Sequence, residues 1–596
     1  MTSGPRTAPA SVSRFVPESL RGYRRSWLRT DIAAGLTLAA VAVPETMGYT
    51  SIAQVPVITG LYTVLFPAIV FALLGSSRLL VVGADSATAA ILAGGLATLG
   101  LAGLTPYSPQ WLALTSLTAL LCGIMLLLAR LLRLGFLGDF LSASVLIGFL
   151  TGVGIQVFTG QLPDMLGIPK GKGGWVEQQW HILTSLGDAS LPTVAFAVAT
   201  LAIIFGFNRF LPKVPGAIVA VVLTIIMASV ADVSSHGVAV VGAMQGGFPP
   251  IGLPQGVGWS DIPPLMTVAF SCFVLIIAQS AATSRSFATR RGQRVDINRD
   301  IVGLSGANLA AGLSGTFVVN GSPTKTQILD EQKGKTQVAN ATMAVVVLLI
   351  LLFFTGVLTN LPKPVLGAIV FVIGLDLVDI AGLRRVWVAR RSECYIAILT
   401  AVVVFAVGVQ QGIVLAVVLS LIEMVRRQYR PHRFVVGLSA AGEPTFQRAA
   451  PGMQSAPGLL VFRYDADLFY ANANQFSDGV QELITTAPDP VRWLVLDCSA
   501  IPDVDYSAGA ALHQLVTFVH NRHATFALAA LDPDLRATLE RFGVLELLHI
   551  DHVYPTVEEA IAAFRSSSPA PTPAEPDTEP AGEPAADQAA DPKETS

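Results

Sequence analysis

The sequence predicts an all-α polytopic membrane domain followed by a small cytoplasmic α/β domain. Three observations lead to this prediction. The 596-residue chain is 52% hydrophobic and 13% charged, whereas soluble domains carry roughly 25% charged residues. The deficit of charge lies in residues 30–430, where apolar runs long enough to cross a bilayer as helices recur. After residue 430 the runs shorten, and strand-like and helix-like patterns alternate.

The apolar runs predict about fourteen membrane segments, because a helix needs ~20 residues to span the hydrocarbon core and several of these runs are shorter. The expected segments are residues 31–48, 58–75, 79–98, 110–131, 140–160, 191–208, 214–231, 264–284, 300–316, 321–333, 337–357, 362–380, 393–409 and 411–428.

The positions of the basic residues predict the orientation of these segments. Arginine and lysine residues follow the even-numbered segments, as Arg130 and Arg133 do after the fourth. The loops on the other side are nearly free of them, and the exceptions are Lys170, Lys172 and Lys363. Because cytoplasmic loops carry the excess of positive charge, we expect both termini in the cytoplasm of a cell whose plasma or inner membrane holds the chain.

The parts outside the membrane have distinct compositions. Residues 1–29 form a basic cytoplasmic lead-in without the apolar core of a cleavable signal. Residues 431–455 are expected to be a linker, and residues 456–565 an α/β domain. Residues 566–596 are rich in Pro, Ala and acidic side chains, which predicts a disordered tail.

Composition also limits the partners. The net charge of −3 gives no reason to expect nucleic-acid binding. The four cysteines lack zinc-site spacing and are predicted to be free, buried thiols, so we expect no metal site and no cofactor.

Two membrane segments are interrupted by polar residues. LLVVGADSATAA (79–90) and VVNGSPTKTQ (318–327) lie in the third and the tenth segments, seven apart. Matching interruptions in two halves of a membrane chain predict an inverted repeat, here seven plus seven, with a central binding site. In each, an extended piece would lead into a half-helix whose first N–H groups and positive dipole end favour an anion.

The second interruption carries a cation, Lys325. Pro323 suits the first turn of a helix, and Ser322, Thr324 and Thr326 supply hydroxyl groups. A lysine at mid-membrane costs ~2.5–3.5 kcal/mol, so it should line a wet cavity or have a partner. The alternative is that Lys325 extends to the cytoplasmic interface.

Several of these stretches resemble a known family. AVPETMGYTSIAQVPVITGLYT (42–63), GSSRLLVVGADSATAA (75–90) and DINRDIVGLSGANLAAGLSGTFVVNGSPTKTQ (296–327) are similar to the helix signatures of the SulP anion transporters. The α/β domain resembles a STAS domain. The resemblance covers residues 15–565 and implies a fourteen-helix inverted-repeat fold, an elevator-like motion and a homodimer.

The resemblance also implies a central substrate site. Three positions depart from the family pattern: Glu45 stands where glutamine is usual, Gln279 where a carboxylate is usual, and Lys325 where arginine is common. The residues that match the family's site are Glu45, Tyr49, Gly83, Ala84, Asp85, Ser86, Gln279, Thr283, Gly321, Ser322, Thr324, Lys325 and Thr326.

Glu45 is the residue we expect to couple transport to a proton. An ionised carboxylate repels an anion a few ångströms away at low dielectric, and protonation removes the repulsion. Burial favours the neutral acid, whereas a nearby lysine favours the carboxylate. The alternative is a buried pair in which Glu45 and Lys325 hold two helices together.

Other residues also have two interpretations. Asp85 suits the N-cap of a half-helix, and a cation ligand is the alternative. Tyr49 either covers the anion or packs in the core. In LVLDCSAIPDVDYSAG (494–509), Ser507 is either a phosphorylation site, as the resemblance implies, or an N-cap, which we favour.

The sequence therefore predicts a secondary transporter, not an enzyme, that carries a small inorganic anion through the bilayer. The family favours sulfate, with bicarbonate or chloride as further substrates. The alternatives are a proton-independent bicarbonate or chloride pathway, a membrane-anchored STAS signalling scaffold and a nucleobase carrier.

Overall fold

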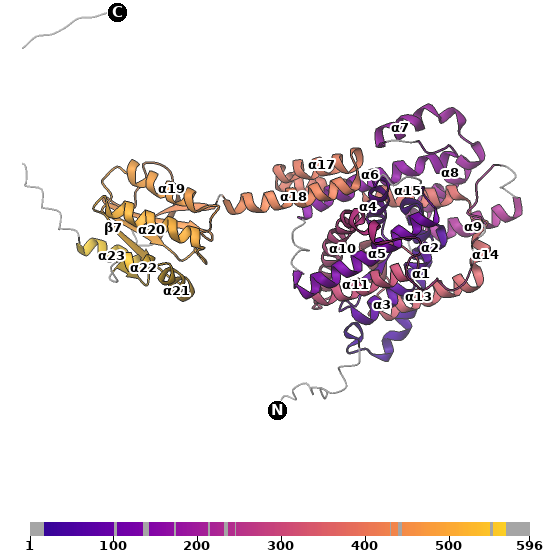
Figure 1. Cartoon of the computed structure of the whole chain (residues 1–596), viewed down its shortest axis with the longest axis horizontal. Coiled ribbons are helices and arrows are strands. Elements are labelled where there is room, and N and C mark those ends of the chain that lie inside the picture. The colour runs from indigo at the N-terminus through magenta and orange to yellow at the C-terminus, as the bar shows by residue number, and fades with distance from the viewer. Residues whose placement is uncertain are drawn as a thin grey trace, which may run out of the picture. The chain divides into compact units, whose positions relative to one another are not determined.

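A computed structural model describes residues 17–99, 104–134, 142–171, 174–211, 215–231, 237–242, 244, 246–429, 431–438, 444–548 and 552–567. The chain divides between Ile422 and Glu423 into two compact units, a helical one and an α/β one (Figure 1). The tail predicted to be disordered is residues 566–596; residues 566 and 567 end the last helix, and residues 568–596 lie outside the described residues, as do residues 1–16 of the lead-in.

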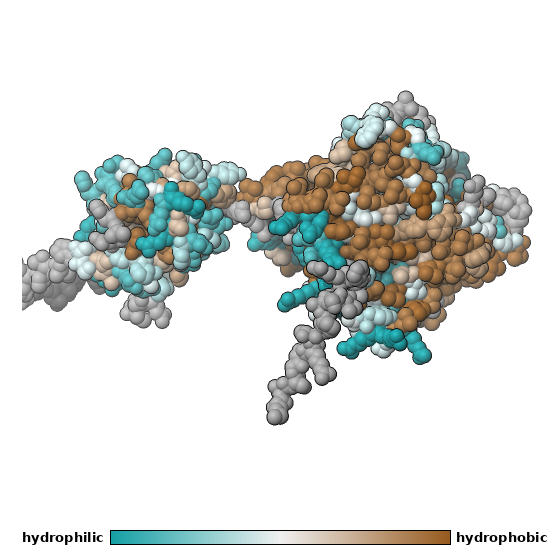
Figure 2. Space-filling model, turned by 60° about the horizontal axis from the view of Figure 1, so that its bottom comes forward, coloured by the Kyte–Doolittle hydropathy of each residue, from teal (hydrophilic) through white to brown (hydrophobic). Residues whose placement is uncertain are grey.

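Within the described residues, nine helical stretches are long and apolar enough to cross a membrane, and residues 86–97 and 216–230 form shorter apolar helices. Figure 2 shows a broad hydrophobic surface on the helical unit. Large apolar side chains of this unit are strongly exposed; Val230 and Phe353, for example, are 84% and 71% exposed. Soluble proteins rarely expose apolar surface on this scale. The surface is suited to contact with lipid tails, and the prediction of an all-α polytopic membrane domain is confirmed.

The helices of this unit pack as two groups. In the first, which we call the core group, contacts between helices from both halves of the chain dominate. The core group consists of α1 (Leu28–Ala53), α2 (Val57–Tyr62), α3 (Phe66–Leu74), α4 (Ser86–Ala97), α5 (Pro109–Leu131), α10 (Ile262–Arg290), α11 (Ile297–Leu313), α12 (Pro323–Glu331) and α13 (Val338–Leu349).

The second group, which we call the flanking group, packs mainly around α6 and α15. It consists of α6 (Ala143–Leu166), α8 (Leu191–Phe210), α9 (Gly216–Ala231), α15 (Lys363–Leu377) and α17 (Arg391–Ala406). The helix α18 (Val409–Tyr429) follows α17, and the hydroxyl of its Ser420 accepts from the N–H of Ser142, the residue before α6. Helix α1 contacts α15 and α9, so it lies at the boundary between the two groups.

The observed helices follow the fourteen expected segments, and the structure adds shorter elements that hydropathy did not predict. The eleventh segment is one continuous helical stretch. It consists of α13, a π-helical turn at Ile350–Phe354 and α14 (Thr355–Leu358). Two short helices, α7 (Trp175–Thr184) and α16 (Ile380–Ala389), connect membrane segments.

The α/β unit contains a six-stranded sheet in the order β4-β3-β5-β6-β7-β8, in which β5 to β8 are parallel and β3 and β4 add antiparallel strands. The strands are β3 (His432–Leu438), β4 (Pro444–Arg448), β5 (Leu459–Asp465), β6 (Trp493–Asp497), β7 (Thr525–Ala529) and β8 (Val553–Tyr554). The helices are α19 (Ala473–Thr486), α20 (Tyr506–His520), α21 (Pro533–Arg541), α22 (Val544–Leu547) and α23 (Val557–Ser567).

Strands β3 and β4 differ from the expected linker at residues 431–455. β3 pairs with β5 from His432↔Asp465 to Val435↔Phe462, so about half of this stretch belongs to the sheet. The sequence signal was weak because β4 is exposed along almost its whole length and lacks a buried face.

Candidate functional site

The two interrupted segments meet in the middle of the core group. β1 (Val81–Gly83) and β2 (Asn320–Ser322) form an antiparallel pair with the register Val81↔Ser322 and Gly83↔Asn320. Strand β1 leads into α4, and β2 leads directly into α12. A Cβ at Gly321 would lie 2.8 Å from Oγ of Ser280, so a larger residue here would require the Ser280 side chain to shift. The pairing brings together the starts of two half-helices that lie more than two hundred residues apart in sequence.

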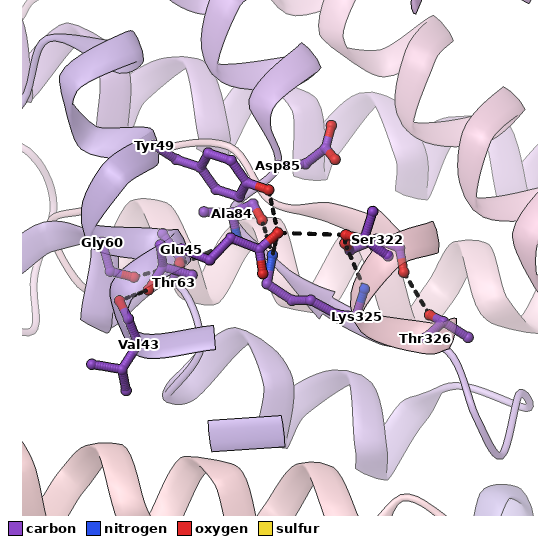
Figure 3. Close-up of polar contacts among 12 residues, drawn as sticks. Val43, Glu45, Tyr49, Gly60, Thr63, Ala84, Asp85, Ser322, Lys325 and Thr326 are labelled. Carbon is purple, nitrogen blue, oxygen red and sulfur yellow. Dashed lines mark hydrogen bonds and ion pairs between the residues drawn. The ribbon is translucent and has the colours of Figure 1, made fainter. Parts of the chain in front are cut away.

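Lys325 lies in the first turn of α12 and is completely buried, with 0% exposure. Its Nζ donates a hydrogen bond to the carbonyl of Ala84 at 2.9 Å and lies 3.4 Å from Oε1 of Glu45. The same amine lies 4.8 Å from the ring centroid of Tyr49, a cation–π distance (Figure 3). Lys325 therefore has partners inside the protein, and the alternative in which it extends to the interface is wrong.

Glu45 is the second charge of this cluster and is 6% exposed. Its Oε1 accepts a hydrogen bond from the hydroxyl of Tyr49 (Figure 3) and another from Oγ1 of Thr324 at 3.4 Å. Its Oε2 is buried and has no hydrogen-bond partner among the described residues. The structure therefore contains the buried Glu45–Lys325 pair, and it leaves one carboxylate oxygen free to bind a proton or a donor.

Asp85 is the N-cap of α4, and the prediction of this role is confirmed. Its Oδ2 accepts from the backbone N–H groups of Ala87 at 3.2 Å and Thr88 at 3.4 Å, and its Oδ1 accepts from Nε2 of Gln279 at 3.3 Å. In Figure 3 the carboxylate is turned away from the amine of Lys325. Because this carboxylate offsets the positive end of α4, the positive potential of the cluster comes mainly from α12 and Lys325.

The remaining hydroxyl groups of the predicted site mostly stabilise the half-helices. Ser322 is the N-cap of α12, accepting from the N–H of Lys325 at 3.4 Å, and its hydroxyl lies 3.1 Å from that of Thr324. Thr326 bonds back to the carbonyl of Ser322 at 2.6 Å and accepts from the N–H of Val81 at 3.1 Å. Thr326 thus connects α12 to β1. Its hydroxyl makes no hydrogen bond to the Glu45 carboxylate.

The predicted residues of α10 lie beside the cluster. Gln279 is buried, and its Oε1 has no hydrogen-bond partner among the described residues. Thr283 bonds to the carbonyl of Gln279 at 2.7 Å on its own helix. Ser86 is buried as the first residue of α4, and Gly83 is the last residue of β1. The structure thus brings the predicted residues of four segments into one region of the core group.

Several supporting polar residues were not predicted. Asn320 accepts from the hydroxyl of Ser280 at 2.8 Å, and Gln337 donates from Nε2 to the carbonyls of Ser77 and Leu80, both at 2.9 Å. Asp300 accepts from the N–H groups of Ser76 and Ser77, both at 2.8 Å. Polar side chains inside apolar segments are a sequence signal for such roles, but their partners are too distant along the chain to be identified from it.

In the α/β unit, Ser507 is not an N-cap, which corrects the interpretation that we favoured. Asp505 is the N-cap of α20, and its side chain accepts from the N–H of Ala508 at 2.8 Å and from that of Tyr470, also at 2.8 Å. Ser507 lies in the first turn of α20 with an exposed side chain. Capping by aspartate leaves the Ser507 hydroxyl accessible, so phosphorylation there stays a prediction.

Comparison with known proteins identifies the family. The profile of the "Sulfate permease family" matches residues 28–400, and that of the "STAS domain" matches residues 450–560. The chain belongs to the sulfate permease family. Its α/β unit is a STAS domain, as the resemblance implied.

The chain is similar over most of its length to a curated relative from Mycobacterium tuberculosis named "Probable sulfate transporter". The two are 35% identical over 547 residues, which cover 91% of this chain and 97% of the relative. "Sulfate transporter 1.2" of Arabidopsis thaliana is 26% identical over 569 residues, covering 91% of this chain and 86% of that protein.

Two solved structures share the fold. The murine anion transporter Slc26a9 in the inward-facing state has a TM-score of 0.81 at 20% identity, covering 95% of this chain and 96% of that chain. The transmembrane domain of the cyanobacterial bicarbonate transporter BicA has a TM-score of 0.56 at 22% identity, covering 67% of this chain and 98% of that chain. The predicted fold class, a helical inverted-repeat membrane domain with a STAS domain, is confirmed.

Proposed function

We propose that this protein is a secondary active transporter that carries a small inorganic anion across the plasma or inner membrane. The observation that carries the proposal is the buried amine of Lys325 at the start of α12, beside the paired strands β1 and β2. A buried cation in the first turn of a helix favours anion binding, since its charge adds to the positive end of the helix dipole. The hydroxyls of Tyr49 and Thr324 donate to the carboxylate of Glu45, which is paired with this amine, and the hydroxyl of Ser322 lies 3.1 Å from that of Thr324.

Sulfate is the substrate that we propose first. The relatives that cover most of this chain, including the 35% identical mycobacterial protein, are named as sulfate transporters. Sulfate has four oxygens that accept hydrogen bonds, and the cluster offers hydroxyl and ammonium donors. Bicarbonate and chloride remain in the test because a structure with this fold belongs to a bicarbonate transporter.

Glu45 is proposed to couple the anion to a proton. When Glu45 is ionised, its carboxylate neutralises Lys325 at 3.4 Å and occupies donors that an anion needs. A proton on the free oxygen Oε2 removes this competition and turns the carboxyl group into a donor toward the anion. One added proton therefore changes the pair from neutral to singly positive, which favours anion binding.

Three further features belong to the proposal. Both termini and the STAS domain lie in the cytoplasm, as the positions of the arginines indicate. The core group moves as one body past the flanking group in an elevator-like step, a motion consistent with the boundary at α1. The functional assembly is a homodimer, which the family resemblance implies and which cross-linking in membranes would test.

The test is uptake by purified protein in liposomes. Radiolabelled sulfate, bicarbonate, chloride and a nucleobase are each offered with and without a pH gradient. We expect sulfate uptake that an inward proton gradient accelerates, and we expect Glu45→Gln to abolish the acceleration. The matched control is Glu331→Gln, since Glu331 is an exposed carboxylate at the other end of α12.

The outcomes separate the alternatives. If Glu45→Gln transports with unchanged pH dependence, the coupling role is refuted while anion transport stands. Uptake of the nucleobase in place of the anions would overturn the substrate class. No flux of any solute would favour a membrane-anchored STAS scaffold.

A further inference from the structure

A cavity lies between the two helix groups, and neither Glu45 nor Lys325 is among its lining residues. It has a volume of about 630 Å³ and is lined by Met47 and Ser51 of α1, Gln161 and Asp164 of α6, and Lys170 and Lys363, among others. Helix α1 belongs to the core group, whereas α6 and α15 belong to the flanking group. The cavity, which we call the vestibule, is therefore an opening at the boundary across which the two groups would have to slide.

The vestibule lies at the end of the helices opposite to the arginine-rich loops. Helix α1 starts at Leu28, beside Arg25 and Arg29, and its contribution to the vestibule comes from Met47 to Ser51 near its other end. Likewise Asp164 lies at the end of α6, and Lys363 is the first residue of α15. By the proposed orientation this end faces outward.

Two of the three lysines that depart from the positive-inside rule line the vestibule. Outer loops of this chain are nearly free of Lys and Arg, with Lys170, Lys172 and Lys363 as exceptions. Lys172 lies outside the described residues, and both of the others line this one cavity although they are far apart in sequence. Lysines in outer loops work against the orientation that the arginines predict. Because two of them line the same cavity, we expect them to have a function there.

The charges of the vestibule leave one cation uncompensated. Nζ of Lys170 lies 2.8 Å from Oδ2 of Asp164, so these two charges neutralise each other. Lys363 has an exposed side chain and forms no ion pair with any described residue. Its backbone N–H is fixed by the carbonyl of Ala239 at 2.8 Å, which holds the start of α15 in place. The charged side chains that line the cavity therefore sum to one positive charge.

We propose that the vestibule is the external capture site for the transported anion, with Lys363 supplying the attracting charge. The proposal rests on the proposed function as an anion transporter. A cation in a cleft with low-dielectric walls raises the local concentration of anions and their rate of arrival, and salt screens the effect. The pair of Lys170 and Asp164 contributes no net charge and closes one wall.

The first experiment replaces Lys363 by cysteine in the full chain and measures transport from each side. We expect Lys363→Cys to raise KM for external sulfate by about three- to tenfold at low ionic strength, since one unit charge near the path is lost. KM for efflux from the cytoplasmic side should not change. The four native cysteines are buried, so the introduced thiol is the accessible one among the described residues.

Chemical modification then tests the charge itself. A membrane-impermeant methanethiosulfonate that attaches a trimethylammonium group should restore the external KM, and one that attaches a sulfonate should raise it further. The matched control is Lys333→Cys, an exposed lysine that follows α12 at the arginine-rich end. It should react only from the cytoplasmic side and leave the external KM unchanged.

A second measurement does not depend on transport. Ser51→Cys places a reporter thiol in the vestibule wall, and its reaction rates with anionic and cationic reagents are compared in chains with Lys363 or Lys363→Gln. We expect the ratio of anionic to cationic rates to fall several-fold without the lysine. An unchanged ratio, or an unchanged KM after complete modification, overturns the capture site. Absence of anion flux in the unmodified protein would instead count against the proposed function.

Discussion

The amine of Lys325 donates to the backbone carbonyl of Ala84 at 2.9 Å, which joins residues 241 positions apart in sequence. The contact places the only charge of the α12 first turn against the end of β1, where the other half of the chain begins its half-helix. Lys325 is therefore both the proposed anion ligand and a connection between the two halves. The two roles predict different results for a double variant in which Glu45 is replaced together with Lys325.

The first prediction concerns the buried pair. Lys325→Met leaves the carboxylate of Glu45 buried without its cation, and we expect a loss of about 3–5 kcal/mol in stability. The double variant Glu45→Gln with Lys325→Met removes both charges and should recover most of that loss, yet it should not transport. Thermal unfolding in detergent and liposome uptake measure the two effects. Recovery of transport in the double variant would show that Lys325 is purely structural.

The second prediction concerns the charge that crosses the membrane. One proton entering with one divalent sulfate moves a net negative charge inward, so an inside-positive potential should accelerate uptake. Glu45→Gln should carry sulfate without the proton and depend more steeply on the potential. Potassium gradients with valinomycin set the potential in liposomes. If the potential has no effect in the unchanged chain, two protons must enter, and a second carboxyl such as that of Asp85 would be involved.

The third prediction concerns the contact between the two helix groups. Gly48 of α1 faces Val370 of α15, and a Cβ at position 48 would lie 2.5 Å from Cγ2 of Val370. Gly48→Ala should therefore push the groups apart, with a cost of about 1–3 kcal/mol and a slower transport cycle. Combining it with Val370→Ala creates room for the new methyl group and should restore the rate. A double variant as slow as Gly48→Ala alone would contradict this assignment.

The fourth prediction separates the two residues at the start of α20. Asp505→Ala removes a cap that accepts from two backbone N–H groups and should destabilise the STAS domain by about 1–2 kcal/mol. Ser507→Ala should change its stability by less than about 0.5 kcal/mol, because the side chain is exposed and does not cap. Urea unfolding of the full-length protein, followed by a STAS-specific probe, compares them. Equal losses would restore the capping role of Ser507.

The fifth prediction concerns Cys498, which follows β6. Burial raises the pKa of its thiol well above the ordinary value of 9.0, and the neighbouring carboxylate of Asp497 adds to the shift. The native thiol should react with a maleimide at least about a hundredfold more slowly than an exposed cysteine such as Lys363→Cys, both at pH 7 and at pH 9. Denaturation should abolish the difference.

The same shift affects stability at alkaline pH. The folded domain retains the thiol proton where the unfolded chain loses it, so the contribution is fully present below pH 9.0 and is lost as the pH rises above it. Cys498→Ala should flatten this part of the pH profile. Equal slopes in both proteins would contradict the shift.

The sequence predicted the membrane segments and the two interruptions because these depend on local composition. Hydropathy over ~20 residues identifies a span, and a polar interruption such as GSPTKTQ stands out against it. Strands of three residues carry no periodicity, so the register Val81↔Ser322 could not be predicted. The partners of Lys325 and the exposed strand β4 were beyond sequence reasoning for a similar reason, since each is determined by chain segments far away.

The pairing of β1 with β2 has a consequence for the chain as a polypeptide. Each three-residue strand satisfies its backbone groups through the other repeat, and lipid offers no water to replace them. A fragment ending after α9 would therefore contain buried backbone N–H and C=O groups without hydrogen-bond partners. The same holds for the complementary fragment that starts at α10. Neither should accumulate when expressed by itself, whereas co-expression of the two should reconstitute a folded protein.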